Sequence, residues 1–285
     1  MNDYLSPVEM PKVDFDSPMA TVLFQLERFR GDASPVTTPT PWLSQIAALS
    51  GSAAPADLPC DGNIDEQFIC GLRKSLPGDY GAEYRRIDYV HGLMWDLSRF
   101  LGEKCAPQYD FLKMAVAFRR FLWISPFVTE NDGVAVLLGM AMLRRLLGCR
   151  PPLFEPSKVF DVTAPDDREG LTRRCETLLQ NLLAELRRTS KYYSVDYVRD
   201  EILSPALKAV VDRRAVTSEE ARALAIAVEK PEISAQDLEC VWQDRFLRSR
   251  SIRKMLDAGF FVALKDGGRK YTLNLEPFFT RFVAL

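Results

Sequence analysis

Apolar residues recur every three or four positions along most of the chain, which is the spacing of helices that bury one face. One segment, 134–147, is apolar nearly all round, which predicts a helix buried in the middle of a bundle. In another, at 63–76, we expect Asn63 to cap the helix, with Glu66 three residues further on. The complete pattern up to position 211 predicts helices at 19–30, 42–49, 63–76, 88–100, 108–124, 134–147, 172–188 and 194–211.

The helical period gives way to alternation between Gly81 and Gly92. There Ile87 and Tyr89 alternate with more polar neighbours between the two glycines, which predicts a short β-hairpin. The first part of the chain is therefore expected to be a helical bundle with one hairpin.

The C-terminal part has a different pattern. Helices are predicted at 217–228, with Thr217 or Ser218 as cap, and at 234–242 and 249–258. Residues 260–275 then predict two strands joined by a tight turn at Asp266, Gly267 and Gly268. Three helices followed by a β-hairpin resemble a winged helix-turn-helix domain.

Composition limits the function classes. The chain has 285 residues, a formal charge of -2 and a pI near 5.7, so a nucleic-acid or membrane partner must be met by a local patch. Its six cysteines show no CxxC pair, which favours a reducing cytoplasm over disulfides or zinc. The N-terminus lacks a leader pattern and no apolar run reaches the roughly 20 residues of a membrane span. We therefore expect a cytoplasmic protein without a membrane partner.

His91 is the only histidine. A His-based zinc site or a Ser-His-Asp triad would have to use it, and we expect it instead to be a packing or hairpin-surface residue. The sequence also has no GxxxxGK(S/T) loop and no GxGxxG after a strand. The common phosphate-binding loops are thus missing.

Residues 118–138, FRRFLWISPFVTENDGVAVLL, resemble the core motif of the Fic family, HPFx(D/E)GNGRxxR. Proteins of that family transfer a nucleotide, usually AMP, onto a protein hydroxyl. Pro126, Phe127 and Asn131 match the motif. The other motif positions differ. Ser125 replaces the histidine and Thr129 replaces the acid. Glu130 and Asp132 replace the two glycines, and Gly133 and Val136 replace the two arginines.

Each of these changes removes chemistry that the resemblance implies. Ser125 has no usable basicity near neutral pH, and Thr129 is a weaker Mg²⁺ ligand than an acid. Glu130 and Asp132 bring negative charge where glycine amides would hold phosphate, and the arginines that bind phosphate oxygens are lost. The resemblance therefore implies a Fic-like helical fold that is catalytically inactive, with no metal and no cofactor. Two alternatives stay open: a divergent nucleotidyltransferase with a non-standard site, and an unrelated bundle in which WISPF is an ordinary helix end.

Other segments are similar to parts of the same family. Gly81, Tyr84 and Arg85 resemble the G-x-(Y/F)-R flap, which holds a target segment by strand addition. The nearest match to the inhibitory (S/T)xxxE(G/N) helix is 52–57, where Ala56 replaces the glutamate. The winged helix is similar to the C-terminal module of many Fic proteins. This division predicts an N-terminal extension at 1–60, a Fic-like core at 61–214 and a winged helix at 215–285.

The winged helix offers the positive functional indication, because its helix and wing are basic in a slightly acidic chain. A basic recognition helix and wing predict contacts with double-stranded DNA. The alternatives are ion pairs with Asp244, Asp257 and Glu239 on a solvated face, and a protein-binding module without DNA. The Fic-like body is then expected to bind a protein partner or a second copy as a homodimer. The predicted DNA-binding residues are Arg248, Ser249, Arg250, Ser251, Arg253, Lys254, Lys265, Arg269 and Lys270.

Overall fold

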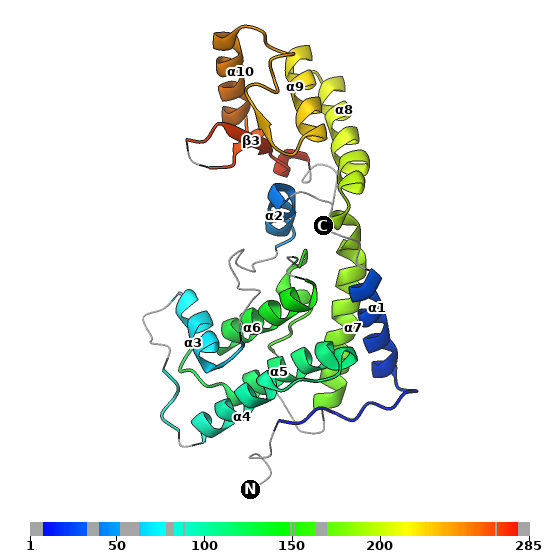
Figure 1. Ribbon diagram of the computed structural model, residues 1–285, viewed down its shortest axis with the longest axis vertical. Coiled ribbons are helices and arrows are strands. Elements are labelled where there is room, and N and C mark those ends of the chain that lie inside the picture. The colour runs from blue at the N-terminus through cyan, green and yellow to red at the C-terminus, as the bar shows by residue number, and fades with distance from the viewer. Residues whose placement is uncertain are drawn as a thin grey trace. The chain divides into compact units, whose positions relative to one another are not determined.

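The computed structural model is mainly helical, as predicted, and has one small sheet (Figure 1). It describes residues 8–32, 40–51, 63–77, 83–87, 89–148, 150, 152–163, 170–265 and 267–278. The chain forms two compact units: unit 1 comprises Met1–Ala33 and Ala53–Arg188, and unit 2 comprises Ser34–Ser52 and Thr189–Leu285. No helix in these described ranges is long and apolar enough to cross a membrane.

Unit 1 is a bundle built around two helices that pack against each other, α5 and α6. The flanking helices pack on this pair, α4 and α1 against α5, and α3 against α6 (Figure 1). The elements are α1 (Pro18–Asp32), α3 (Glu66–Ser75), α4 (Val90–Gly102), η2 (Pro107–Tyr109), α5 (Asp110–Ile124), α6 (Asn131–Leu146), η3 (Pro156–Lys158) and α7 (Leu171–Thr189).

The core of unit 1 explains why residues 134–147 are apolar nearly all round. Most of α6 is buried, which confirms the prediction. Gly139 faces the Phe160 ring, and that ring lies 5.1 Å from the ring of Phe118 on α5. The absence of a side chain at Gly139 therefore lets an aromatic pair fill the space beside α6.

Unit 2 contains a three-stranded antiparallel sheet with the order β1-β3-β2. Ile233 on β1 pairs with Tyr271, and Phe261 on β2 pairs with Leu273. The order of helix, short strand, turns, helix and hairpin is that of a winged helix. The elements are α2 (Thr40–Leu49), η4 (Ser190–Tyr193), the π-helix η5 (Tyr197–Leu203), α8 (Ser204–Asp212), α9 (Ser218–Glu229), β1 (Ile233–Ser234), α10 (Arg245–Asp257), β2 (Phe261–Ala263) and β3 (Lys270–Leu273).

Four local predictions were wrong in detail. The cap of α3 is Asp65, whose carboxylate accepts a hydrogen bond from the Phe68 amide, and Asn63 lies outside the helix. The segment 194–211 is interrupted by the π-helix η5. Helix α10 begins at Arg245 instead of 249, because Asp244 accepts from the Leu247 amide and caps it earlier.

The fourth concerns 234–242, which forms hydrogen-bonded turns instead of a regular helix. The Asp237 carboxylate accepts hydrogen bonds from the amide and hydroxyl of Ser234, and Ser234 itself pairs in β1. A segment this short has little intrinsic stability as a helix. Its first residue, Ser234, is part of strand β1 instead.

The hairpin expected at 81–92 is not observed in the part of this segment that the structure describes. Residues 83–87 are irregular, and α4 already begins at Val90. Gly81, the segment 52–57 with Ala56, and Asp266 in the wing turn lie outside the described residues. The predicted domain limits at 60 and 214 stay a prediction; among the described residues, 40–51 and 189–214 fall in the same compact unit as the winged helix.

Candidate functional site

The loop that carries the Fic-like motif joins α5 to α6, and a left-handed residue stands at each end of it. Ser125, with φ 45°, ends α5, and its amide donates to the Phe121 carbonyl at 2.9 Å. Its hydroxyl donates to the Leu122 carbonyl at 2.6 Å. Glu130, with φ 62°, precedes α6. The Ser125 hydroxyl thus donates its proton to a carbonyl at the end of its own helix.

Asn131 closes the loop from the other side. Its Oδ1 accepts from the Phe127 amide at 2.8 Å, and its Nδ2 donates to the Phe127 carbonyl at 2.9 Å. Phe127 is buried, with its ring 6.2 Å from the ring of Phe121. This pair of bonds satisfies both backbone groups of a buried residue, so the motif asparagine acts here as a structural clamp.

Thr129, at the position of the motif acid, lies against a buried cation. Arg73 of α3 is 1% exposed, and its Nη2 donates to the Thr129 hydroxyl at 3.2 Å. A fixed guanidinium this close to the position opposes the binding of a divalent cation there by direct charge repulsion. The arrangement suits a neutral side chain and not a Mg²⁺ ligand.

The segment that resembles the flap is fastened to the same loop. The Arg85 amide donates to the Pro126 carbonyl at 2.7 Å, and Arg85 Nη2 donates to the Ile124 carbonyl at 3.0 Å. The Tyr84 ring lies 5.4 Å from that of Phe127 and 5.3 Å from that of the exposed His91. Burial, followed by the neighbouring Cys70, raises the pKa of Tyr84, so its hydroxyl stays protonated near neutral pH. Tyr84 and Arg85 therefore act here as parts of the scaffold of the loop.

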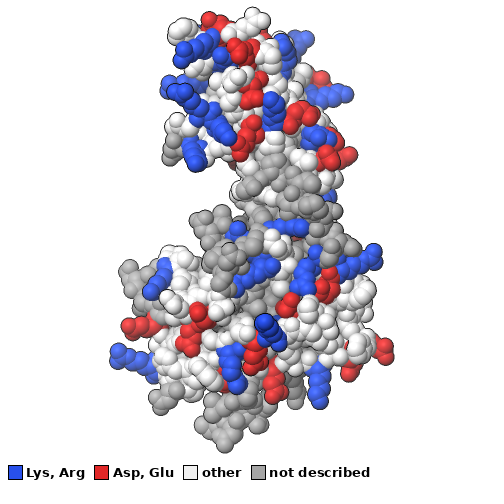
Figure 2. Space-filling model, in the orientation of Figure 1, with Lys and Arg blue, Asp and Glu red and all other residues white. Residues whose placement is uncertain are grey.

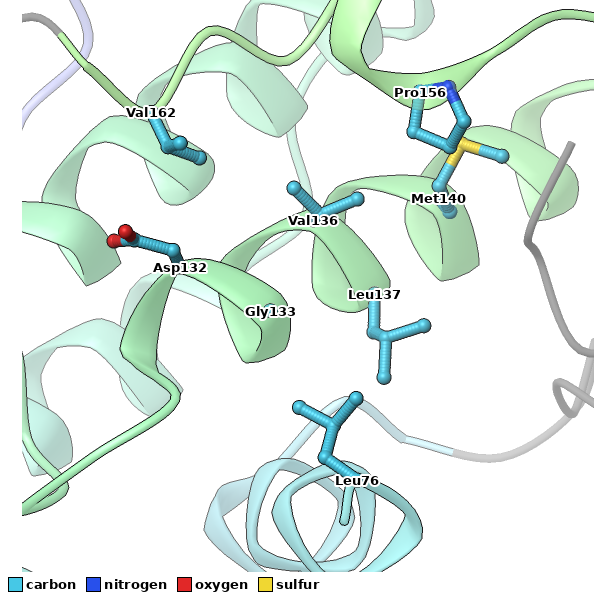
Figure 3. Close-up of a pocket in the computed structure, with 8 residues that line it drawn as sticks. All are labelled: Leu76, Asp132, Gly133, Val136, Leu137, Met140, Pro156 and Val162. Carbon is cyan, nitrogen blue, oxygen red and sulfur yellow. The ribbon is translucent and has the colours of Figure 1, made fainter. Parts of the chain in front are cut away.

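The motif positions that would hold arginines line an apolar pocket of about 320 Å³ (Figure 3). Gly133 and Val136 lie along one side, and Leu76 from the end of α3 lies across from Leu137. Among the described residues, Asp132 is the one charged member of this lining. The described side chains therefore offer no cation to a phosphate.

In unit 2, three of the predicted DNA-binding cations are held in ion pairs. Arg248 donates to the Trp242 carbonyl at 3.1 Å and lies 3.5 Å from Glu239, one of the acids expected to pair. The other two pairs join elements distant in sequence: Lys254 with Glu220 at 2.6 Å and Lys270 with Glu232 at 3.1 Å. Hydrogen bonds from Lys254 and Thr217 lower the pKa of Glu220, although burial alone would raise it. These three cations therefore already have acidic partners within the protein.

The other predicted cations are presented to solvent. Arg250 and Arg253 are exposed on α10, opposite its buried Ile252. Lys265 and Arg269 flank the hairpin turn and are also exposed. Among the residues that the structure describes, none of these four is in an ion pair. Figure 2 shows basic side chains gathered where unit 2 carries α10 and the hairpin, with acidic side chains beside them.

The two predicted serines differ in access, and one residue was missed. Ser249 is exposed, whereas Ser251 is half-buried. Phe246, in the first turn of α10, has 84% of its surface exposed. The sequence prediction started this helix at 249 and therefore omitted Phe246. Asp244, a typical N-cap residue two positions before Phe246, would have indicated the earlier start.

The fold and these two sites define a mainly helical protein with a bundle and a winged helix. No family model matches the sequence, and no curated protein matches it. The structure is similar to the crystal structure of a Fic family protein from Desulfovibrio desulfuricans G20, with a TM-score of 0.43 and 15% identity, over 93% of this chain and 98% of that one.

Proposed function

We propose that this chain is a regulatory protein that binds double-stranded DNA through its winged helix, with a motif site that does not transfer nucleotides. The observation that carries the proposal is the set of four exposed cations without an ion pair to any described residue: Arg250 and Arg253 on α10, and Lys265 and Arg269 on the wing. In a chain of net charge -2, a local cluster of this kind supports phosphate binding.

The test is the salt dependence of binding to mixed-sequence duplexes, measured by fluorescence anisotropy with the full chain. Neutralising four phosphates gives a log-log slope of about -3.6. Replacing Arg250 and Arg253 together by alanine is expected to reduce that slope by about 2 and to weaken binding. Replacing Arg86 and Lys104 of unit 1, which are exposed and in no ion pair with a described residue, removes the same charge and is expected to leave the slope unchanged. Absence of salt-dependent binding, or equal losses in both variants, rejects the proposal.

The inactive motif site is supported by the contacts of Ser125 and Thr129 and by the apolar pocket. We expect millimolar ATP with Mg²⁺ to leave the melting temperature unchanged, and labelled nucleotide not to be transferred to any protein. Transfer that is lost in Ser125→Ala would contradict this and favour a divergent nucleotidyltransferase.

A second candidate function is protein binding by unit 1. Aromatic side chains are exposed on α4 and just before it, at Trp95 and Tyr89, and Val128 is exposed in the motif loop. Trp and Tyr are frequent anchors of protein interfaces. Light scattering over a range of concentrations tests whether the chain forms a homodimer. Self-association that weakens in Trp95→Ala supports this function. A chain that stays monomeric at all concentrations rules out the homodimer.

A further inference from the structure

Phe246 lies in the first turn of α10, which Asp244 caps. Asp244 caps the helix, accepting from the Leu247 amide at 2.7 Å with its side chain and from the Arg248 amide at 2.9 Å with its carbonyl. The first turn is therefore fixed, and the helix presents a phenylalanine from it to solvent. A single exposed apolar residue is common on protein surfaces, so exposure alone does not indicate a function for Phe246. Its position relative to other side chains on the helix does.

That position is in line with the exposed arginines. Phe246, Arg250 and Arg253 have the i, i+4, i+7 spacing of one helix face, while Ile252 and Met255 are buried on the other. With a rise of 1.5 Å per residue, the three side chains extend over about 10 Å of helix. At 3.4 Å per base pair, this distance matches about three base pairs.

A recognition helix places its N-terminal residues, here Phe246, against the base edges of the major groove. Phenylalanine makes apolar contact there with the 5-methyl group of thymine. Arg250 and Arg253, further along the same face, are the cations that neutralise phosphates. Phosphates, by contrast, offer nothing to an aromatic ring.

We infer that α10 recognises DNA sequence as well as phosphate, with Phe246 contacting a thymine methyl group in the major groove while Arg250 and Arg253 neutralise phosphates. This inference rests on the proposed DNA binding. It assigns to Phe246 a role in specificity that the four cations do not supply.

The experiment begins with a preferred duplex selected from a random pool by the full chain. Each thymine of that duplex is then replaced by deoxyuridine, which removes only the methyl group. The wild-type chain is expected to bind about fourfold more weakly at one or two such positions, the loss of about one buried methyl group. Phe246→Ala is expected to bind the original duplex more weakly and to lose this thymine preference. Its salt slope is expected to stay the same, since Phe246 neutralises no phosphate.

Leu247→Ala is the matched control. Leu247 is also exposed but lies about 100° further round the helix, so this variant is expected to keep the thymine preference. A wild-type chain indifferent to every methyl group overturns the inference, as does a Phe246→Ala chain that retains the preference. If instead the full chain shows no salt-dependent binding to any duplex, the proposed function has failed and the inference fails with it. Salt-dependent binding unaffected by Phe246→Ala would leave the proposed DNA binding intact and overturn the inference about Phe246 alone.

Discussion

Asn131 matches the Fic-like motif and stabilises the loop through hydrogen bonds to the backbone of Phe127. Together with Pro126, whose carbonyl accepts from Arg85, it holds the loop between α5 and α6 in one conformation. The changed positions Ser125 and Thr129 are occupied by contacts inside the protein. At the scale of single residues, the loop is thus held in one shape, and the hydroxyls of Ser125 and Thr129 make hydrogen bonds inside the protein.

We expect Asn131→Ala to destabilise unit 1 by about 2–4 kcal/mol, because it leaves the amide and the carbonyl of the buried Phe127 without partners. Hydrogen exchange of the core amides of α5 and α6 measures the change. Asn131→Asp keeps the acceptor and loses the donor, so it is expected to fall between the wild type and Asn131→Ala. Equal protection in all three proteins would show that the two bonds contribute nothing.

Among the elements, α6 depends on a close approach at Gly139. A β-carbon there would lie 2.5 Å from Cε1 of the buried Phe160 ring. We expect Gly139→Ala to cost about 1–3 kcal/mol through overpacking, despite the better helix propensity of alanine.

Gly71 provides the control for that substitution. It lies in α3, is exposed, and has nothing within 4 Å of its β-carbon position. Gly71→Ala is therefore expected to stabilise the protein by up to about 1 kcal/mol. Thermal unfolding of the two variants measures both effects, and a stabilising Gly139→Ala would mean that the Phe160 ring moves aside freely.

The turns at 235–241 depend on Asp237. Hydrogen bonds from Lys230 and then from Ser234 lower its pKa to about 2, below its ordinary value of about 3.9. Because the folded-state pKa is the lower one, the stabilisation is present above about pH 4 and is lost as the pH falls toward 2.

Asp237→Asn tests this pH dependence. The side chain is 26% exposed, and solvent screening limits the expected loss at pH 7 to about 1 kcal/mol. Unfolding measured from pH 7 to pH 2 is expected to show the difference from wild type shrinking toward zero at the acid end. A difference that stays constant with pH would exclude the carboxylate charge as its source.

At the scale of the whole molecule, a segment near the N-terminus completes the winged-helix unit. Gln45 on α2 donates from Nε2 to the Leu273 carbonyl at 3.0 Å, and its Oε1 accepts from the Leu275 amide at 2.7 Å. These bonds span more than 220 positions of sequence. A fragment limited to residues 215–285 therefore lacks part of its own unit.

We expect Gln45→Ala to destabilise unit 2 by about 2 kcal/mol, since it leaves two backbone groups of the C-terminal segment unsatisfied. Faster hydrogen exchange of the Leu275 amide measures the loss. Gln45→Glu retains the acceptor for that amide and is expected to protect it better than alanine does. Unchanged exchange in Gln45→Ala would show that α2 is not needed to hold this segment.

Local pattern was enough to predict much of the fold. The spacing of apolar residues located α1, α5 and α6 to within a few positions, and of the two caps expected for α9 it is Thr217 that caps the helix, in a capping box with Glu220. Some errors were local, at the caps Asp65 and Asp244, and others arose where a residue's neighbours come from elsewhere in the chain. The alternation that starts at Arg86 predicted a hairpin, yet α4 already begins at Val90, and the Arg85 amide and side chain bond to the motif loop.

The sequence by itself determined the helices, the wing hairpin and the replacement of the reactive motif residues, because helical period, caps, turns and residue chemistry are local properties. Only the tertiary structure decided that Lys254 and Lys270 are paired while Arg250 and Arg253 are free to meet solvent. It also decided that Gly133 and Val136 line an apolar pocket and that α2 joins the winged-helix unit. The physical reason is that ion pairs, pockets and unit boundaries depend on distances between residues far apart in the chain, and a linear pattern does not specify those distances.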